Sequence, residues 1–474
     1  MKTIVIGAGP AGLTAAYQLS KETPEVAVFE AANSVGGLAR SLKLWGQTVD
    51  LGPHRFFSED RRVNELWLEV VGKDYAMVNR QTRILYQTEL FKYPLEAFDA
   101  LAKLGAIEAC RCLASYARGC ISPVSKDDSF ESWVCRRFGR RLFEIFFKTY
   151  SEKLWGIPCD ELDSDFAAQR IKKFSLSAAV KSALFSSIRK EHRTLADQFA
   201  YPTGGTGMFY EKMAKTICQH GGEVHLQTPV KRVLTNSGRV TGVELSSGET
   251  LACNHVISTM PLTVLAMQLD NVLAEVVKAC QQLQFRNTIL VYLEVLNENP
   301  FPDNWIYAHS PELHFGRVTN FRNWVPQLYG ESPNAILAME YWCNADDEFW
   351  RWDEQVLIAQ AQEEIVKSGV VKDSKTLGRS FVFRIPRCYP VYRRGYQAHL
   401  RVIKDYLSAI SGLQVIGRYG SFKYNNQDHS ILMGIMAAEN ILQAKAHDLW
   451  NINADYDVYQ EACSITETGL VQTI

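Results

Sequence analysis

The stretch Gly7-Ala8-Gly9-Pro10-Ala11-Gly12 decides the fold, because this Gly-x-Gly-x-x-Gly pattern stands between a predicted strand and a predicted helix. The β-branched run Thr3–Ile6 predicts the strand, and Ala11–Leu19 predicts the helix. In such a unit the first glycine permits a tight turn, the second lets backbone N–H groups approach a pyrophosphate, and the third lets helix and strand pack closely. The pattern therefore predicts a dinucleotide whose phosphates lie at the helix N-terminus.

Glu30 strengthens this interpretation. It closes a second predicted strand, Glu25–Phe29, eighteen residues after Gly12, where a carboxylate can accept hydrogen bonds from ribose hydroxyls. A strand–helix–strand unit of this kind predicts a parallel sheet with a right-handed crossover. A glycine turn without a ligand is the alternative, but it does not explain why strand, helix and acidic residue all fall at these places.

The composition of the whole chain excludes several classes of protein. The 474 residues suggest two or three domains. With 51 Lys and Arg residues against 52 Asp and Glu residues, the net charge is −1, which argues against a general nucleic-acid binder. The 11 cysteines are scattered without a repeated Cys-x-x-Cys, so we expect free thiols, no disulfide scaffold and no metal site.

After the first fifty residues the pattern changes along the chain. Residues from about Glu59 to Arg193 predict mainly helix. Asn287–Leu296 and Asn334–Trp342 alternate β-branched and aromatic residues, which predicts strands of a second sheet. Leu413–Ile416 predicts one more strand, followed by a glycine turn and a helix from about Ser430. We therefore expect two layers that interleave along the chain.

The residues after Glu30 indicate which dinucleotide is bound. Val35-Gly36-Gly37-Leu38-Ala39-Arg40 resembles the second glycine pair and the arginine of FAD-binding proteins of the amine-oxidase and glutathione-reductase type. The resemblance implies that Arg40 lies near the FAD pyrophosphate, where a guanidinium can make two parallel hydrogen bonds. A solvated loop charge is the alternative for Arg40. Gly204-Gly205-Thr206-Gly207 lacks a preceding strand and an acidic partner, so we expect FAD and no separate nicotinamide domain.

That superfamily also includes the protoporphyrinogen oxidases. Four further stretches indicate one branch of it. They are GPHRFF at 52–57, FFKTYSEKLWG at 146–156, YPTGG at 201–205 and GRYGSFKYNNQDHS at 417–430. In these stretches the chain resembles the UDP-galactopyranose mutases, and the last stretch is the most specific. The resemblance covers most of the chain but fades between about Asn297 and Phe383.

The resemblance implies a set of substrate-binding and catalytic residues. Tyr150 and Trp155 would hold the uridine with their aromatic faces. A set of two arginines and two tyrosines would grip the substrate diphosphate: Arg170, Arg286, Tyr389 and Tyr424. We also assign Tyr201 and Asn426 to the substrate. The alternatives are core positions for the aromatic rings and interdomain ion pairs for the arginines.

The same resemblance implies the FAD contacts. They are Gly7, Gly9, Pro10, Ala11, Gly12, Glu30, Gly36, Gly37, Arg40, Gly52, Pro53, His54, Val230, Gly417, Arg418, Asn426, Gln427 and Asp428.

In this family N5 of reduced FAD attacks the anomeric carbon and expels the nucleoside diphosphate, and the sugar then recloses as the other ring form. No side chain is needed as the nucleophile, and the chain has no Ser/His/Asp or paired-carboxylate motif that we can place. His54 would support the reduced flavin as one of the catalytic residues, with a satisfied core histidine as the alternative.

The segment Pro300–Ser380 departs from the mutase pattern. Within it, the stretch from His314 to Trp324 looks more like FAD oxidoreductases of the protoporphyrinogen oxidase type. Two further hypotheses therefore stand beside a nucleotide-sugar pyranose/furanose mutase. One is an oxidoreductase of the protoporphyrinogen oxidase or amine oxidase kind, which takes hydride from a small molecule. The other is a flavin-binding protein without catalysis.

The expected fold class is α/β. A FAD-binding Rossmann-like domain of the glutathione-reductase type would be interleaved with a helical and antiparallel-sheet substrate domain. We assign residues 1–65, 201–262 and 412–458 to the first, residues 66–200 and 263–411 to the second, and residues 459–474 to a tail.

The N-terminus and the charges suggest a cytoplasmic protein. The apolar run after Met1 ends at once in glycines, and no run approaches the ~20 apolar residues of a membrane span. Arg136, Arg137, Arg140 and Arg141 share a helix with apolar residues, and we interpret them as a solvated face, not a membrane-binding surface. The expected partner is a nucleotide sugar, and the flavin's reductant and the oligomeric state stay open.

Overall fold

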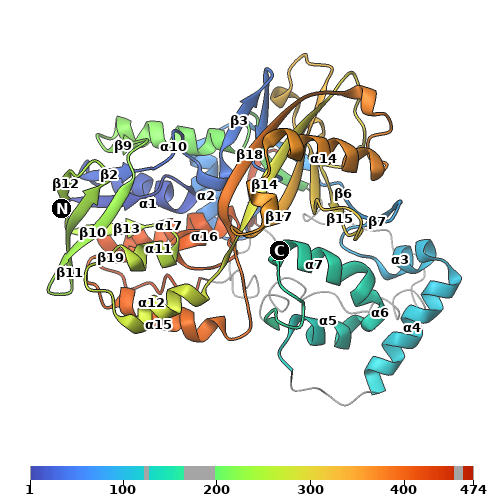
Figure 1. Cartoon of the computed structure of the whole chain (residues 1–474). Helices are drawn as coiled ribbons and strands as arrows, with labels where there is room; N and C mark the ends of the chain where they lie inside the picture. Colours follow the sequence, from blue (N-terminus) through green and yellow to red (C-terminus); the bar gives the residue numbers. More distant parts are fainter. Residues whose placement is uncertain (1, 122–126, 165–197, 453–462, 473–474) are drawn as a thin grey trace. The chain divides into compact units, whose positions relative to one another are not determined.

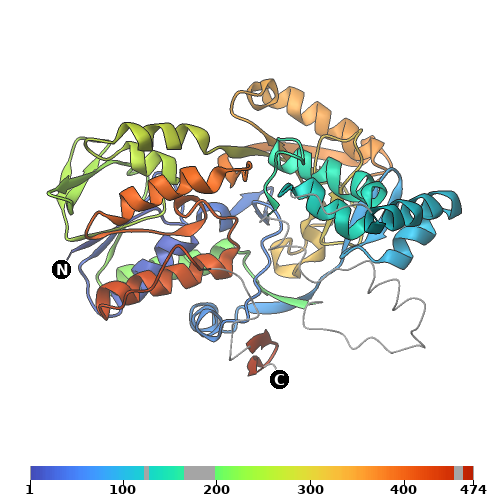
Figure 2. The same cartoon turned by 90° about the horizontal axis from the view of Figure 1, so that it is seen from below.

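A computed structural model describes residues 2–121, 127–164, 198–452 and 463–472. The chain divides into two compact units, each built from separate stretches (Figures 1 and 2). Unit 1 comprises 1–78, 199–284 and 396–474, and unit 2 comprises 79–198 and 285–395. Each unit is described by itself below.

The central sheet of unit 1 is parallel throughout. Its five strands lie in the order β19-β13-β1-β2-β9 (Figure 1). They are β1 (Thr3–Ile6), β2 (Val26–Phe29), β9 (Glu223–His225), β13 (His255–Ser258) and β19 (Leu413–Val415). The predicted strands at Thr3–Ile6 and Glu25–Phe29 are confirmed, and the predicted helix between them is α1 (Pro10–Ser20).

Helices from three parts of the chain bury the faces of this sheet. Among them are α1, α2 (Arg61–Val71), α10 (Gly207–Gln219) and α17 (Gln427–Leu442), whose apolar residues form one core. The tightest approach is between α1 and α17. A Cβ added to Gly434 would lie 2.6 Å from the carbonyl oxygen of Ala11 and 2.7 Å from Cβ of Thr14. Since only glycine fits there, α17 packs directly on the first turns of α1.

Smaller elements complete unit 1. A three-stranded antiparallel sheet, a hairpin, a strand pair and four helices surround the central sheet. They are β10 (Val230–Asn236), β11 (Arg239–Leu245), β12 (Thr250–Ala252), β3 (Ser41–Leu44), β4 (Gln47–Asp50), β5 (Tyr75–Asn79), β8 (Gln198–Pro202), α11 (Leu262–Met267), α12 (Ala274–Gln282), α15 (Tyr396–Ser408) and α16 (Gly417–Gly420).

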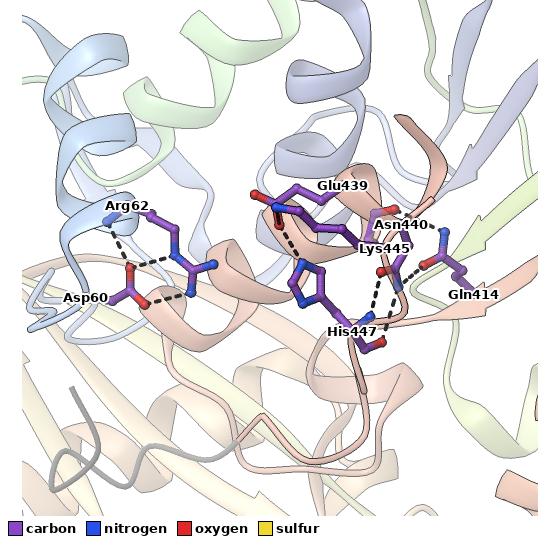
Figure 3. Close-up of polar contacts among 8 residues, drawn as sticks. Asp60, Arg62, Gln414, Glu439, Asn440, Lys445 and His447 are labelled. Atoms are coloured by element: carbon purple, nitrogen blue, oxygen red, sulfur yellow. Dashed lines mark hydrogen bonds and ion pairs between the residues drawn. The ribbon is translucent and has the colours of Figure 1, made fainter. Parts of the chain in front are cut away.

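The chain beyond α17 is fastened to unit 1 at several points. Nε2 of His447 lies 2.6 Å from a carboxylate oxygen of Glu439, and the backbone N–H of His447 donates to the amide oxygen of Asn440 at 2.8 Å (Figure 3). Asn440 in turn donates to Oε1 of Gln414 at 3.1 Å. These bonds satisfy groups at the end of α17 and direct the segment that follows it.

The predicted tail is wrong where the structure describes it. β20 (Cys463–Thr466) and β21 (Gly469–Gln472) form an antiparallel hairpin. The side-chain amide of Asn64, on α2, donates to the carbonyl oxygen of Cys463 at 3.1 Å. The carboxylate of Asp60 caps α2 nearby, accepting from the backbone N–H of Arg62 at 2.9 Å (Figure 3). The alternating Cys-Ser-Ile-Thr run was the missed strand signal.

Unit 2 is built on a seven-stranded sheet. Its order is β18-β14-β17-β16-β15-β6-β7, antiparallel except for the β6–β15 pair. The strands are β6 (Thr82–Tyr86), β7 (Glu89–Lys92), β14 (Phe285–Val295), β15 (Trp305–Ala308), β16 (Arg317–Asn320), β17 (Ala335–Cys343) and β18 (Leu377–Pro390).

The two faces of this sheet differ in chemistry. Ile289, Val291, Met339 and other alternate residues form one apolar core with α14 (Glu354–Lys367). Because side chains alternate along strands, the opposite face carries Thr288, Glu340, Trp342, Arg317 and their row neighbours. This second face is called the polar face below.

Helices make up the remainder of unit 2 (Figure 1). They include α3 (Ala97–Leu104), α4 (Ala106–Ile121), α5 (Phe130–Phe138), α6 (Arg140–Phe143), α7 (Thr149–Trp155) and α13 (Glu348–Arg351), with a π-helical turn at Glu144–Lys148 before α7. The arginines of α5 and α6 have local partners: Arg140 pairs with Glu131 at 2.7 Å, and Arg141 pairs with Glu108. These pairs favour the solvated face over a membrane-binding one.

Two sequence-based boundaries are corrected by the structure. Residues 66–200 were predicted mainly helical, yet β5, β6 and β7 lie there, because the strands are short and lack a long alternating pattern. Residues 263–411 were assigned to the substrate domain, but α12 and α15 belong to unit 1, as Val276 and Ile403 are buried there. No helix in the described ranges is long and apolar enough to cross a membrane.

Candidate active site

The turn between β1 and α1 needs its glycines for steric reasons. Gly7 has φ +97°, and a Cβ added to it would lie 2.1 Å from Oγ1 of Thr259. A Cβ on Gly12 would lie 2.0 Å from the carbonyl oxygen of Gly7. The first and third glycines of the motif therefore let α1 start directly against the sheet.

The N-terminus of α1 has no side-chain cap. Gly9, at the N-cap, has no side chain to cap the helix, and Pro10 follows it in the first turn. The turn containing Gly36 and Gly37 lies against Gly9: a Cβ on Gly37 would be 3.1 Å from Cα of Gly9. The backbone N–H of Gly36 donates to the carbonyl oxygen of Ala8 at 2.8 Å. Two glycine turns thus form a bare backbone cradle at the positive end of a helix, which suits a pyrophosphate.

Glu30 is held rigidly beside this cradle. Its Oε2 accepts the backbone N–H of Ala8 at 2.7 Å, and its Oε1 accepts that of Ala32 at 2.8 Å. Each carboxylate oxygen keeps a further lone pair, so both can still accept ribose hydroxyls. The backbone N–H of Thr228 donates to the carbonyl oxygen of Glu30 at 2.9 Å, which brings Val230, at the start of β10, into the same neighbourhood.

Arg40 follows the second glycine turn. It comes directly after the short 3₁₀ helix Gly37–Ala39, and its Nη1 donates to Oγ of Ser34 at 3.2 Å. This bond ties the side chain of Arg40 to the loop between Glu30 and Gly36.

The C-terminal motif packs beside the start of α1. Gly417 has φ +83°, and a Cβ on it would lie 3.2 Å from Cβ of Ala11. Arg418 stacks on the ring of Tyr424, with 4.4 Å from the guanidinium carbon to the ring centroid. Asn426 caps α17 in a capping box with His429, and Asp428 is buried in the first turn. The side chain of Asn426, predicted to reach both substrate and flavin, thus has a helix-capping role.

His54 lies in a loop that is fastened through its carbonyl oxygen. That oxygen accepts from Oγ1 of Thr206 at 3.0 Å and from Nε2 of Gln427 at 3.3 Å. Gly52, two residues earlier, has φ +106° and turns the chain after β4, and Pro53 follows it. The predicted cofactor residues at 52–54 and 427 are therefore brought together in unit 1.

Tyr201 has a structural role that was not predicted. Its hydroxyl donates to Oδ2 of Asp50 at 2.6 Å, and Tyr201 has no exposed surface. Asp50 also accepts from Oγ1 of Thr206 at 2.7 Å and from Oγ of Ser41 at 2.6 Å. Burial raises the pKa of Asp50 despite these bonds, and it raises the pKa of Tyr201 as well. Direct contact of Tyr201 with a substrate does not fit this placement.

In unit 2, Arg286 is fixed at the start of β14. Its Nη2 donates to the carbonyl oxygens of Trp342 at 2.8 Å and Lys153 at 3.0 Å, and its Nε to that of Leu154 at 3.4 Å. The carboxylate of Asp347 is 3.6 Å from Nη1. Burial lowers the pKa of Arg286, with Asp347 opposing that effect.

Gly156 makes room for this guanidinium. It ends α7 with φ +67°, and a Cβ on it would lie 2.4 Å from Nη1 of Arg286. The FFKTYSEKLWG stretch therefore contributes to the arginine site through its backbone, by two carbonyl groups and one glycine.

The predicted aromatic residues surround the same place. Tyr389 pairs with Arg286 across β14 and β18, and the ring of Trp155 meets Tyr389 edge-on at 6.4 Å. Tyr150 stacks on His309 at 4.7 Å and meets Trp342 edge-on at 5.6 Å. Unit 2 thus gathers four of the predicted residues: Tyr150, Trp155, Arg286 and Tyr389. Tyr424 belongs to unit 1, and Arg170 lies outside the described residues.

Sequence reasoning missed several buried polar groups of unit 2. Arg317 and Glu340 form a two-pronged ion pair on the polar face, with Nε–Oε1 and Nη2–Oε2 distances of 2.6 Å. Lys153 donates to the carbonyl oxygens of Ala308 and Ser310, and burial lowers its pKa to about 8. A lone carboxylate in the otherwise apolar run Ala335–Cys343 was the available signal, because a buried charge needs a partner.

Comparison with known families settles the class of the chain. The model of the flavin-containing amine oxidoreductases matches residues 10–442. The chain belongs to this family. FAD is accordingly its cofactor, and the glycine cradle, the uncapped helix N-terminus and Glu30 in unit 1 fit that dinucleotide. Flavin supplies hydride or nucleophilic chemistry when bound.

The curated relatives in this flavin family are only distantly similar to this chain, and their names describe oxidation reactions. Coproporphyrinogen III oxidase of Mycobacterium tuberculosis is 24% identical over 451 residues, which is 88% of this chain and 95% of that protein. The zeta-carotene-forming phytoene desaturase of Myxococcus xanthus is 23% identical over 370 residues, 72% of this chain and 70% of that protein.

Solved structures of the family give the fold. A reduced UDP-galactopyranose mutase superposes with a TM-score of 0.84 at 21% identity, over 96% of this chain and 97% of that one. A putrescine oxidase with bound putrescine superposes with a TM-score of 0.65 at 17% identity, over 93% and 99% of the two chains. The mixed α/β flavoprotein fold is therefore shown.

Proposed function

We propose that this flavoenzyme is a nucleotide-sugar mutase, which interconverts the pyranose and furanose forms of a sugar attached to a nucleoside diphosphate. The observation that carries the proposal is the environment of Arg286. This arginine is only 4% exposed, yet its hydrogen bonds go to three main-chain carbonyl oxygens, not to a carboxylate.

Other arginines of unit 2 show how different this is. Arg83, Arg317 and Arg379 each place two nitrogens on a buried carboxylate, those of Asp303, Glu340 and Glu294. The closest recorded carboxylate of Arg286 is Asp347, whose oxygen is 3.6 Å away and whose side chain is 40% exposed. A buried guanidinium with weak compensation is ready to bind an anion. Its Nη1, the nitrogen without a carbonyl partner in the described ranges, is the donor we assign to a diphosphate oxygen.

The surroundings of Arg286 supply the rest of the proposed site. Tyr389, opposite it on β18, brings a phenol hydroxyl to the same end of the strand pair. The rings of Tyr150 and Trp155 offer aromatic surface for a planar base. A diphosphate that leaves and returns needs donors that hold it throughout, and these fixed side chains meet that need.

When bound, reduced flavin would supply nucleophilic chemistry at the sugar. The chain's residues hold the reactants. Glu30 and the two glycine turns bind the dinucleotide, and the carbonyl-anchored His54 loop supports the flavin end of it. The reaction is redox-neutral, so the enzyme needs an external reductant only to reach its active state.

A second candidate is an oxidoreductase that takes hydride from a small molecule. The observation in its favour is that the curated relatives are desaturases and a coproporphyrinogen oxidase by name. The two candidates differ in what happens to the flavin. An oxidoreductase must pass its electrons to an acceptor after each turnover, whereas a mutase finishes each turnover with reduced flavin.

Product analysis tests the proposal. Purified yellow protein is mixed with UDP-galactopyranose and a panel of UDP- and dTDP-hexoses, with and without dithionite, and the products are separated by chromatography. We expect a new isomer of one sugar nucleotide, formed only with dithionite. If no isomer forms from any sugar while some metabolite reduces the flavin anaerobically, the enzyme is an oxidoreductase.

A further inference from the structure

The proposed function makes no use of a largely buried lysine in unit 2. Lys153, on α7, donates from Nζ to the carbonyl oxygen of Ser310 at 2.7 Å and to that of Ala308 at 3.2 Å. Ala308 is the last residue of β15, and Ser310 lies in the connection that leads to β16. The side chain of Lys153 thus ties α7 to this connection on either side of His309.

His309 is held between these two bonds. Its imidazole lies against the ring of Tyr150, with 4.7 Å between the ring centroids and 18° between the planes. The imidazole also makes a hydrogen bond with the main chain of Phe146, in the π-helical turn that precedes α7. Because His309 is only 8% exposed, it covers one side of Tyr150 as a fixed part of the interior.

The ring of Tyr150 is located by these neighbours. Tyr307 and Trp342 meet it edge-on, at 5.5 and 5.6 Å, and His309 stacks on it. Tyr150 itself is partly exposed, and its ring is the aromatic surface that we assigned to the nucleotide base. Lys153 is therefore connected to that surface through His309.

The charge of Lys153 is only weakly compensated. Within the described ranges, its hydrogen bonds go to main-chain carbonyl oxygens and not to a carboxylate. Glu364, on α14, and Glu312, in the β15–β16 connection, attract it from a longer distance. Burial lowers the pKa of Lys153 to about 8, and the two glutamates oppose that effect. The ammonium group therefore loses its proton in a pH range in which a solvated lysine stays charged.

The other titratable groups that face Lys153 keep their charge in that range. The carboxylates of Glu312 and Glu364 stay ionised. Burial and the charge of Lys153 lower the pKa of His309 to about 3, so its imidazole stays neutral. Arg286, whose Nη2 donates to the carbonyl oxygen of Lys153 at 3.0 Å, stays protonated. Near pH 8, Lys153 is thus the group of this set that changes its charge.

We propose that Lys153 is a positioning residue of the nucleotide site: its charged Nζ fixes the β15–β16 connection, so that His309 holds the ring of Tyr150 in place for the base. This inference rests on the proposed function, because it needs a base that stacks on Tyr150. Lys153 itself does not touch the nucleotide. When the ammonium loses its proton, both hydrogen bonds lose the contribution of the charge, and the connection is held less firmly. The affinity for the nucleotide therefore falls as the pH rises through about 8.

The stability of the fold depends on this proton in the opposite direction. A lysine whose pKa in the folded protein lies below the unfolded value of 10.5 binds fewer protons in the folded state. The free energy of unfolding therefore gains from Lys153 as the pH rises from about 8 toward 10.5, because the cost of burying its charge is relieved. A purely structural lysine would make affinity follow stability, whereas a positioning lysine makes the two diverge.

The test measures the dissociation constant of UDP for the FAD-loaded protein from about pH 7 to about pH 9.5, by the change in protein or flavin fluorescence. The wild type is compared with Lys153→Met, Lys153→Arg and Lys103→Met. Methionine has a similar length without the charge, and arginine keeps a charge that does not titrate in this range. Lys103→Met is the matched control, since Lys103 donates to the carbonyl oxygen of Leu90 at 2.7 Å elsewhere in unit 2.

We expect the affinity of the wild type to fall about tenfold across this pH range, more than that of Lys153→Arg. Lys153→Met should bind about tenfold more weakly than the wild type at pH 7 and should lack this additional fall. Lys103→Met should behave like the wild type. Ionisation of the uracil itself affects all four proteins alike, so the comparison between them removes it.

Two results would overturn the inference while leaving the proposed function in place. One is an equal pH profile for the wild type and Lys153→Arg, and the other is wild-type affinity in Lys153→Met at pH 7. A wild type that binds no UDP at any pH in the range would overturn both the inference and the proposed function.

A second measurement separates positioning from folding. From about pH 8 upward, the difference in melting temperature between the wild type and Lys153→Met should shift in favour of the wild type, while the affinity of the wild type falls. A shift against the wild type, parallel to its loss of affinity, would assign Lys153 a purely structural role and contradict the inference.

A double variant tests the route through His309. His309→Ala alone should weaken UDP binding, because it removes the support of Tyr150. Adding Lys153→Met to it should then cost less than Lys153→Met costs in the wild type, since both changes act on the same ring. Fully additive losses would contradict a positioning role through His309.

Discussion

The glycine cradle in unit 1 is built mainly from backbone groups, whereas the polar face in unit 2 is built from side chains. In the cradle, the turns at Gly7–Gly12 and Gly36–Gly37 bring bare backbone to the N-terminal end of α1, and Glu30 is the main side chain. On the polar face the side chains come from four separate strands, and Gly316 leaves room for the ring of Trp342. A site made of backbone groups is encoded by a short run of sequence. A site made of side chains from several strands depends on which strands pair and in which register.

The largest effect is expected at the cradle. There, Gly12→Ala and Gly9→Ala distinguish an effect on folding from an effect on FAD binding. The added methyl of Gly12→Ala would lie 2.0 Å from the carbonyl oxygen of Gly7, so α1 must move off β1 and FAD is lost with stability. Gly9→Ala meets nothing closer than 3.9 Å and has φ −82°, so its apoprotein should melt like the wild type.

The measurement is flavin absorbance per protein together with the melting temperature of each apoprotein. For Gly9→Ala we expect a clear loss of FAD at an unchanged apoprotein melting temperature. Full FAD content in Gly9→Ala would show that the backbone at Gly9 does not approach the pyrophosphate.

The next largest effect is expected at Arg286. Arg286→Lys keeps a charge but loses the forked donor, and at ~1.5–3 kcal/mol for each charge-assisted hydrogen bond, kcat/KM of the mutase reaction should fall roughly a hundredfold. The matched control is Arg379→Lys, on the strand that pairs with β14, which should stay within about twofold. Equal losses in both variants would mean that sheet integrity, not anion binding, is being measured.

A smaller effect on UDP affinity is expected at Gly156, which leaves room for the guanidinium of Arg286. In Gly156→Ala the new methyl would lie 2.4 Å from Nη1 of Arg286 and displace it, so the affinity for UDP should fall about tenfold. Gly72→Ala is the control, because Gly72 also ends a helix at φ +67° but has no atom within 4 Å of the added methyl. If both variants bind UDP alike, backbone strain and not displacement of Arg286 is responsible.

The smallest effect concerns an ion pair at the rim of unit 2. Arg379 holds the pKa of Glu294 at about 2, below the ordinary value of a glutamate. A carboxylate with a lowered pKa stabilises the fold above its unfolded pKa, and this contribution fades as the pH falls from about 4.5 toward 2. Arg379→Met should therefore lower the melting temperature by a few degrees at pH 7, and by less at pH 3, in thermal unfolding scans. A difference that stays constant with pH would contradict the assignment.

The same contrast explains what sequence reasoning could find. The β1–α1–β2 unit and its cofactor were predicted because their signals are local: both glycine turns, Glu30 and Arg40 all lie between Gly7 and Arg40. Tyr201 was misassigned because a YPTGG pattern does not reveal that Asp50, far away in sequence, accepts its hydroxyl.

The strand register of unit 2 could not be predicted from the sequence, because its paired residues lie far apart in the chain. Arg317 and Glu340 are paired by an antiparallel register that no motif records. An amphipathic pattern likewise shows that α12 and α15 have a buried face, but not which unit buries it. Steric requirements of neighbouring residues can therefore be predicted from a single sequence, whereas the partners of a residue on other strands can be identified only from the structure.

A redox-neutral isomerisation of a nucleotide sugar must turn over many times without changing the oxidation state of the flavin. The flavin is reduced anaerobically with dithionite, excess reductant is removed, and UDP-galactopyranose is added in large excess while the flavin spectrum and the products are followed together. We expect many equivalents of isomer for each flavin, with the spectrum still that of reduced flavin at the end. No isomer from this or any other sugar nucleotide, while the flavin stays reduced, would contradict it. Reduction of the oxidised enzyme by some metabolite under anaerobic conditions would then identify an oxidoreductase.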